Sequence, residues 1–226
     1  MITKEELTNR LRHCDETDLE ENMVGAAILI NPDGTQHAAI FLRYNSESKL
    51  FHFTGKSVII EDVSGMEDYY LKSLDFLPAI LLPAFMAQSE LILEKAQPEF
   101  GYFYEGSLYD TNGDFVSPGA SPQYMTCVGF CLNVIKGFLS DQDFFQYEDW
   151  DEKSLIGKME HVESFLSRVN ESYPDIKLED FKVNLRRILP IEYVAGAFSR
   201  DLPVRKAFTD SIVEDLQKSL DEKKVA

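Results

Sequence analysis

Three side chains of this sequence are of the types that nucleophilic catalysis uses: Cys127, His37 and His52. A thiolate is a strong nucleophile, and the unpaired N–H groups at the start of a helix stabilise it. A histidine can take the proton from the thiol, while a second polar group fixes the orientation and tautomer of that imidazole. We therefore consider a Cys-His-His site in which the thiol of Cys127 has a pKa below that of a free cysteine.

Cys127 lies where an apolar segment with helical spacing begins. Thr126 is an acceptable N-cap residue, and the prolines at 118 and 122 keep the preceding chain extended, so Cys127 is expected in the first helical turn. The alternative is that Cys127 is a small buried hydrophobic residue, which is the common role of an unpaired cysteine. Cys131 lies one turn later and is interpreted as core packing.

The remaining cysteine, Cys14, follows His13 in a charged segment. We expect an exposed thiol without a role there, with a weak metal site as the alternative. A metal site formed by Cys127, Cys131 and a histidine is a further interpretation, although no residue with the usual ligand spacing follows. The catalytic interpretation itself requires no metal and no cofactor.

The two histidines are predicted on neighbouring strands. The apolar run Val24–Ile30 ends at Asn31-Pro32-Asp33-Gly34, and His37–Tyr44 follows, which predicts a hairpin across a tight turn. Leu50–Phe53 and Val58–Ile60 extend it to an antiparallel meander of three or four strands. Because alternate residues of a strand share a face, His37 and His52 can meet. Taken singly, each histidine is better explained as a half-exposed strand residue.

The other segments are mostly predicted to be helical, and the predicted fold class is α+β. Residues 98–124 form an irregular segment with one short strand around Phe100–Tyr104, and a loop of this length is often functional. Pro78 and Pro83 are expected to break or kink the helix that contains them. The predicted helical segments are part of 3–22, Met66–Ala96, Cys127–Leu139 (apolar on nearly every side and therefore buried), Lys153–Val169, Leu178–Leu189 and Arg205–Leu220.

A change in composition after Ser140 predicts a boundary. We divide the chain into an N-terminal helical segment, 1–22, a core, 23–140, with a helical insertion at about 66–97, and a mainly helical C-terminal extension, 141–226. The 44% of hydrophobic residues is enough for a sizeable core.

The charge and the cysteine count restrict the partners and the compartment. A formal net charge of −17 disfavours nucleic acids and anionic lipid surfaces as partners. No secretory signal and no membrane span are expected, because the longest apolar stretch, Phe76–Ala87, is short and interrupted by proline. Three cysteines argue against a disulfide framework. A cytoplasmic location is the expectation.

Two segments resemble a known superfamily. Gly34-Thr35-Gln36-His37-Ala38-Ala39-Ile40-Phe41-Leu42, continuing to Leu50-Phe51-His52, looks like the histidine hairpin of the NlpC-type papain-like hydrolases. Thr126-Cys127-Val128-Gly129-Phe130 is similar to their Asp-Cys-Ser-Gly-Phe nucleophile segment. Histidine precedes cysteine, as in the circularly permuted branch that includes the lecithin retinol acyltransferase-like proteins and bacterial peptidase or amidase relatives.

The resemblance implies a permuted papain-like fold, an antiparallel sheet packed on the buried helix that carries the nucleophile. It also implies a nucleophile at Cys127, a general base at His37, an orienting residue at His52 and an oxyanion contact from the backbone N–H of Cys127. It covers roughly residues 24–60 and 100–139, about a third of the chain. Thr and Val replace the polar residues that usually flank the cysteine.

Two functions follow as hypotheses. The first is a cysteine-dependent hydrolase or acyltransferase that cleaves an amide, peptide or ester bond through a thioester. The second is a non-catalytic interaction or immunity-type protein with the same fold, whose partner binds the aromatic loop Phe100–Tyr104 or the C-terminal helices. The separation of Cys127 from His37, and a cleft between them, discriminates the two.

Overall fold

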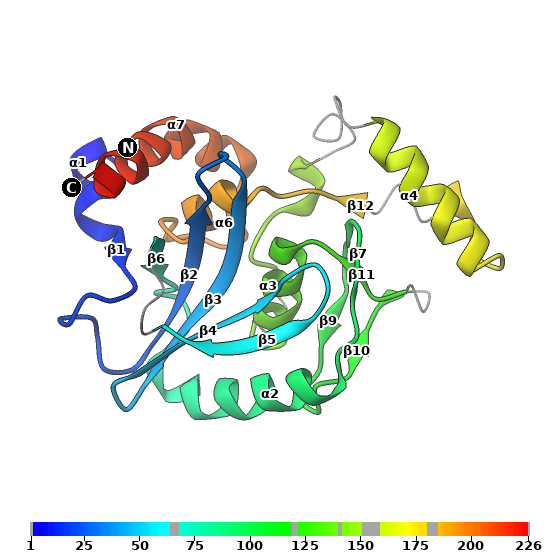
Figure 1. Ribbon diagram of the computed structural model, residues 1–226, viewed down its shortest axis with the longest axis horizontal. Coiled ribbons are helices and arrows are strands. Elements are labelled where there is room, and N and C mark those ends of the chain that lie inside the picture. Colours follow the sequence, from blue (N-terminus) through cyan, green and yellow to red (C-terminus); the bar gives the residue numbers. More distant parts are fainter. Residues whose placement is uncertain are drawn as a thin grey trace.

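The computed structural model describes residues 2–63, 68–118, 122–139, 142–150, 159–179 and 185–225. It is an α+β structure with a six-stranded antiparallel sheet, helices packed on it and a mainly helical C-terminal part (Figure 1). The strand order is β1-β6-β2-β3-β4-β5. The coarse fold class predicted from the sequence is therefore confirmed.

The predicted hairpin and meander are confirmed. β2 (Met23–Ile30) pairs with β3 (Gln36–Tyr44) along its whole length, and β4 (Glu47–Phe53) and β5 (Val58–Asp62) continue the meander. The first turn is closed by a 2.9 Å hydrogen bond from the Gly34 amide to the Asn31 carbonyl. Gly34 has a φ of +81°, which glycine adopts without the strain that a side chain would cause.

The sheet has six strands, whereas at most four were predicted. One of the two additional strands lies in a segment that was predicted to be helical. Within the segment expected to be helical from Met66, residues Tyr69–Ser73 form β6, which pairs with β2. Tyr69 packs on one face of the sheet and Tyr70 on the other. An apolar run buried on both sides cannot be told from a buried helix by periodicity. β1 (Arg12–His13) pairs with β6 at the edge.

The second half of the same segment is helical. A short 3-10 helix, η1 (Ala79–Leu81), follows Pro78 and leads into α2 (Leu82–Lys95). Pro83 occupies the first turn of α2, where the missing N–H has no intrahelical partner to lose. The prolines therefore precede and start the helix, and the prediction that they break or kink it was wrong.

The two faces of the sheet are covered differently. α2, α3 (Cys127–Lys136) and α6 (Pro190–Gly196) pack on one face, against a core that includes Ile40 and Phe51. Residues 128–135 of α3 are all buried, which confirms the predicted buried helix. On the other face a smaller cluster contains Phe41 and Leu50, covered by Cys14 and Leu19 of the N-terminal segment.

The segment 98–124 is built from very short strands rather than one. These are β7 (Glu99–Phe100), β8 (Phe103–Tyr104), β9 (Leu108–Tyr109), β10 (Phe115–Val116) and β11 (Tyr124–Met125). β11 pairs in parallel with β7 and leads directly into α3. β8 pairs with β12 (Leu185–Arg186), so this part of the predicted helix Leu178–Leu189 is a strand; residues 180–184 lie outside the described residues.

The C-terminal third contains α4 (Met159–Ser172), α6 and α7 (Lys206–Val225), besides η3 (Tyr147–Asp149). α4 confirms the described part of one predicted helix, and α7 confirms the last. α7 packs on α1 (Lys4–Arg10), the predicted N-terminal helix, so both ends of the chain lie together (Figure 1). No helix among the described residues is long and apolar enough to cross a membrane. The division into three parts stays a prediction.

Candidate functional site

The two histidines meet as predicted. His37 of β3 and His52 of β4 lie on the same face of the sheet, and Nε2 of His37 is 2.7 Å from Nδ1 of His52. Phe41 of β3 pairs with Leu50 of β4, so two residues further along His52 lies opposite Ala39. His37 is the next residue on the same face of β3, which makes the two histidines diagonal neighbours, close enough for their rings to contact. Their ring centroids are 4.8 Å apart in an edge arrangement.

A third polar residue, Glu61 of β5, extends this pair and was not found from the sequence. Its Oε1 lies 2.7 Å from Nε2 of His52. In the β4–β5 pairing His52 faces Ile59 and Leu50 faces Glu61, so Glu61 shares the face of the histidines. One signal in the sequence could have identified it. Glu61 is a charged residue in a mostly apolar strand, and the register of the β4–β5 hairpin places it on the same face as His52.

The chain of hydrogen bonds determines which ring nitrogens carry protons. A carboxylate only accepts, so Nε2 of His52 donates to Glu61. Nδ1 of the neutral His52 ring then accepts a hydrogen bond from Nε2 of His37. Nδ1 of His37 consequently has no proton and is the basic atom of the group.

Burial keeps both imidazoles neutral. His52 is 4% exposed, and burial lowers its pKa, with the hydrogen bond to Glu61 acting in the opposite direction. Burial, together with the nearby His52, lowers the pKa of His37 to about 4. A neutral His37 can accept a proton at pH 7, although its low basicity makes it a modest base in the resting protein.

Cys127 occupies the position expected for a nucleophile. It is the first residue of α3, and Oγ1 of Thr126 caps the helix by accepting the amide of Gly129 at 3.0 Å. Its side chain is half-buried beside β3, and the backbone N–H of Ala38, the residue after His37, interacts with its sulfur. The predicted helix start and cap are confirmed.

The predicted low pKa of the thiol is not confirmed. Burial raises the pKa of Cys127, and the Ala38 N–H, the amides of its own turn and the charge of Arg187 counteract this only in part. The start of a helix lowers the pKa of a thiol, but burying the thiolate anion raises it, and burial is the larger effect here. The resting thiol is therefore protonated.

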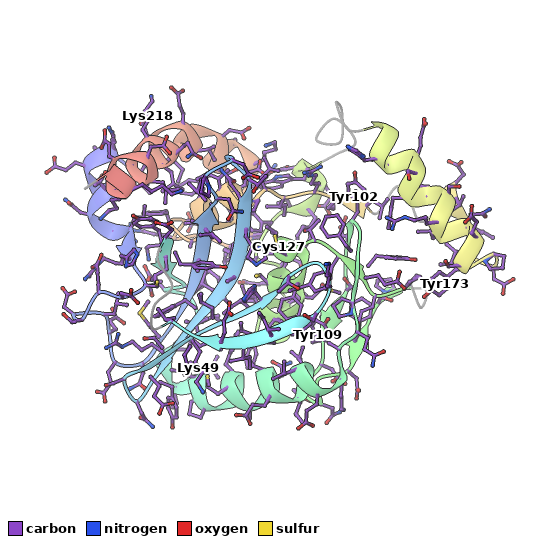
Figure 2. All side chains as sticks on the ribbon, viewed as in Figure 1. Lys49, Tyr102, Tyr109, Cys127, Tyr173 and Lys218 are labelled. Carbon is purple, nitrogen blue, oxygen red and sulfur yellow. The ribbon has the colours of Figure 1, made fainter. Side chains whose placement is uncertain are left out.

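The thiol and the imidazoles lie on different faces of β3, and the backbone N–H of Ala38, next to His37, interacts with the sulfur. Ala38 packs toward α3, whereas His37 lies on the opposite face with Ala39. Among the described hydrogen bonds, none joins the Cys127 thiol to an imidazole. Figure 2 shows Cys127 at the end of α3 beside the strands, with Tyr102 between it and α4.

Of the other two cysteines, one lies where the sequence predicted and one does not. Cys131 is fully buried in the main core, as expected. Cys14 is only 1% exposed, so the expected exposed thiol was wrong: it packs under the sheet with Leu19, and burial raises its pKa to about 12.

The candidate metal ligands were also tested by the geometry. Among the described residues, His13, Cys14 and Asp15 are the group whose ligand atoms lie close together, within 4.8 Å of one another. Within the part of the chain that the structure describes, Cys127, Cys131 and a histidine do not form such a group, so that interpretation was wrong.

The aromatic loop is partly used inside the protein. Tyr102 is buried against Phe165 of α4, with ring centroids 5.3 Å apart, whereas Phe100 is 59% exposed. A partner surface at this loop stays a prediction.

Comparison with protein-family models, with curated proteins and with solved structures finds no match for this chain.

Proposed function

We propose that this protein is a cysteine-dependent hydrolase or acyltransferase that acts on an amide, peptide or ester bond. Cys127 is the nucleophile, His37 the general base, His52 its orienting partner and Glu61 a positioning residue. The observation that carries the proposal is the chain His37–His52–Glu61, which leaves a basic Nδ1 one residue from the amide that contacts the sulfur. The finer fold assignment, a permuted papain-like arrangement, belongs to the same proposal.

The reaction proceeds in two transfers of an acyl group. The thiol gives its proton to Nδ1 of His37 while the sulfur attacks the carbonyl carbon, and the resulting oxyanion is stabilised by the backbone N–H of Cys127. The intermediate collapses to a thioester and expels the amine or alcohol, which takes the proton from His37. Water or an acceptor then attacks the thioester, His37 takes its proton, and the thiol is restored.

The pKa directions indicate when the thiol is activated. Burial holds the Cys127 thiol and the His37 imidazole in their neutral forms, because it raises the pKa of the first and lowers that of the second. A substrate carbonyl that displaces water between them lets proton transfer and attack occur together. Deprotonation is thus part of the reaction rather than a property of the resting enzyme.

The experiment is to compare wild type with Cys127→Ser and His37→Gln on a panel of nitrophenyl esters and peptide amides. We expect Cys127→Ser to lower kcat/KM by about a thousandfold or more and His37→Gln by about a hundredfold or more. Cys131→Ser is the matched control, because that thiol is buried in the core. Turnover that persists in Cys127→Ser would contradict the proposal.

A chemical test needs no substrate. Cys127 is half-buried while Cys14 and Cys131 are buried, so iodoacetamide is expected to modify Cys127 first, as followed by peptide mass spectrometry of the native protein. If Cys127 were the slowest of the three, it would not be an accessible nucleophile.

The second candidate is a non-catalytic binding protein with this fold. It is favoured by two observations: no described hydrogen bond joins the thiol to an imidazole, and burial raises the pKa of the thiol. The substrate panel decides between the two, since a binding protein shows no turnover that depends on Cys127. A cytoplasmic location is proposed for either function, supported by three cysteines that form no disulfide.

A further inference from the structure

A pocket of about 320 Å³ opens beside the residue that precedes the candidate nucleophile. It lies between the loop that follows β7, the start of α3 and one side of α4. Its walls are partly aromatic and partly polar or cationic. The lining residues are Phe100, Gly101, Tyr102, Thr126, His161, Ser164, Phe165, Arg168 and Arg187.

The charge of this pocket is opposite to that of the protein. The chain carries 39 acidic and 22 basic residues, yet the described residues of the lining include two arginines and neither aspartate nor glutamate. The acidic surface repels small anions, whereas a cationic hollow in it attracts them and concentrates them at that point. The pocket is therefore distinguished from the rest of the surface by its electrostatics.

The two guanidinium groups have no acidic partner among the residues that the structure describes. The described salt bridges use other arginines, such as Arg12, Arg186 and Arg205. Arg187 is half-buried in the coil after β12, and Arg168 of α4 lies 5.9 Å from the centre of the Phe165 ring. Arginine held in this way binds carboxylates through its planar pair of N–H donors.

One of these charges also acts on the candidate nucleophile. Arg187 is near enough to Cys127 for its charge to lower the pKa of the thiol against the effect of burial. An anion bound to Arg187 would thus lie within the dimensions of one small substrate from the sulfur. A pocket of this volume holds a short organic acid or a peptide end rather than a long chain.

We propose that the substrate is an acyl compound whose acyl part carries a carboxylate, which binds Arg187 and Arg168 while its carbonyl lies at Cys127. This assignment rests on the proposed function of Cys127 and adds the substrate class. Arg187 is the principal contact, because its charge acts on the thiol, and Arg168 closes the pocket from α4. The aromatic walls hold the carbon chain between the two groups.

The test uses two esters of the same length that differ in charge: the mono-4-nitrophenyl ester of glutaric acid, and 4-nitrophenyl valerate. We expect kcat/KM to favour the glutarate ester, and Arg187→Gln to lower the ratio of the two values about tenfold, with a smaller fall for Arg168→Gln. Arg200→Gln is the matched control, since it removes the same charge from an exposed position in a different hollow. The ratio in that variant should equal that of wild type.

The outcomes separate the two proposals. Hydrolysis that depends on Cys127 but shows no preference for the acid, or a ratio unchanged in Arg187→Gln, overturns the carboxylate site and leaves the proposed function standing. Absence of hydrolysis that depends on Cys127 overturns the proposed function, and the anion site is then judged by a reaction that needs no turnover.

That reaction is alkylation of Cys127 by iodoacetate and by iodoacetamide, which differ only in the charged group. The ratio of the iodoacetate rate to the iodoacetamide rate should fall several-fold in Arg187→Gln and stay constant in Arg200→Gln. An equal ratio in wild type and Arg187→Gln would remove the anion site altogether. Protection of Cys127 by inorganic phosphate, but not by glutarate at the same concentration, would overturn the assignment to a carboxylate.

Discussion

The two faces of the six-stranded sheet are built from the same strands but bury different groups. Toward α3, alternate residues such as Ile40 and Phe51 form the main apolar core with Phe130. Toward the N-terminal segment, the intervening positions hold a small apolar cluster and, next to it, His37, His52 and Glu61. Because successive side chains of a strand point to opposite faces, apolar core residues and the polar chain can lie within a few ångströms of each other on different faces of the sheet.

This difference shows what the register of the strands has to achieve. A slip by one residue would place the two imidazoles in the apolar core and would expose the core residues on the other face. The long β2–β3 pairing, formed by eight residue pairs, holds that register. The stability of the helix-covered face therefore fixes the geometry of the polar chain on the opposite face.

The largest expected effect on stability comes from a substitution in the core of the helix-covered face. Phe130 is fully buried, and its ring contacts those of Phe51, Phe53 and Tyr109. Phe130→Ala should lower the free energy of unfolding by about 4 kcal/mol, because it removes a large side chain from a site closed on all sides. Denaturation by urea, followed by circular dichroism, measures this value.

The matched variant on the opposite face is Phe41→Ala. Phe41 is equally buried, but it packs in the smaller cluster beneath the N-terminal segment. We expect a smaller loss than for Phe130→Ala, since a short covering segment can settle into the space that is left. A loss as large as that of Phe130→Ala would mean that the two faces are equally rigid.

The second prediction concerns pH and only the polar face. Burial lowers the pKa of His37 to about 4 and also lowers that of His52, so the folded protein excludes protons that the unfolded chain binds below about 6.5. Above that pH neither state binds them; between about 6.5 and 4 stability falls as the pH falls, by on the order of 3 kcal/mol for His37. Below 4 this contribution no longer changes.

Urea denaturation at several pH values tests this, with His37→Gln as the comparison. The variant should lose a large part of the pH dependence between 6.5 and 4, because the group that titrates only in the unfolded chain is gone. Profiles of the same slope in both proteins would show that His37 is not held neutral by the fold.

The sequence predicted the parts of this arrangement that depend on local patterns. The turn at Gly34, the strands bearing His37 and His52, and the capped helix at Cys127 follow from short-range rules of turns, alternation and capping. Those rules also predicted that the two histidines meet. The catalytic roles of these residues stay predictions.

What the sequence did not predict depends on long-range contacts. β6 was taken for helix because burial on both faces removes the alternation, and Cys14 was expected at the surface because its neighbours are charged. Glu61 and Arg187 reach the site through strand pairing and through a coil far along the chain. The raised pKa of Cys127 likewise follows from burial, which no local pattern reports.

The smallest expected effect concerns Glu61, at the end of the polar chain. In Glu61→Gln the shape of the side chain is kept, but the amide can donate a hydrogen bond to Nε2 of His52 as well as accept one. When it donates, the proton of His52 moves to Nδ1, and Nε2 of His37 must accept instead of donate. Nδ1 of His37 then carries the proton and cannot act as the base.

We therefore expect Glu61→Gln to lower kcat/KM about tenfold, with little change in the free energy of unfolding. The tautomer of His37, read from its ¹⁵N chemical shifts, is the measurement that a merely structural role of Glu61 would leave unchanged. Asp62→Asn is the matched control, because this substitution removes the same charge from an exposed position on the same strand. Equal rates and equal ¹⁵N shifts in wild type and Glu61→Gln would reduce the polar chain to its two histidines.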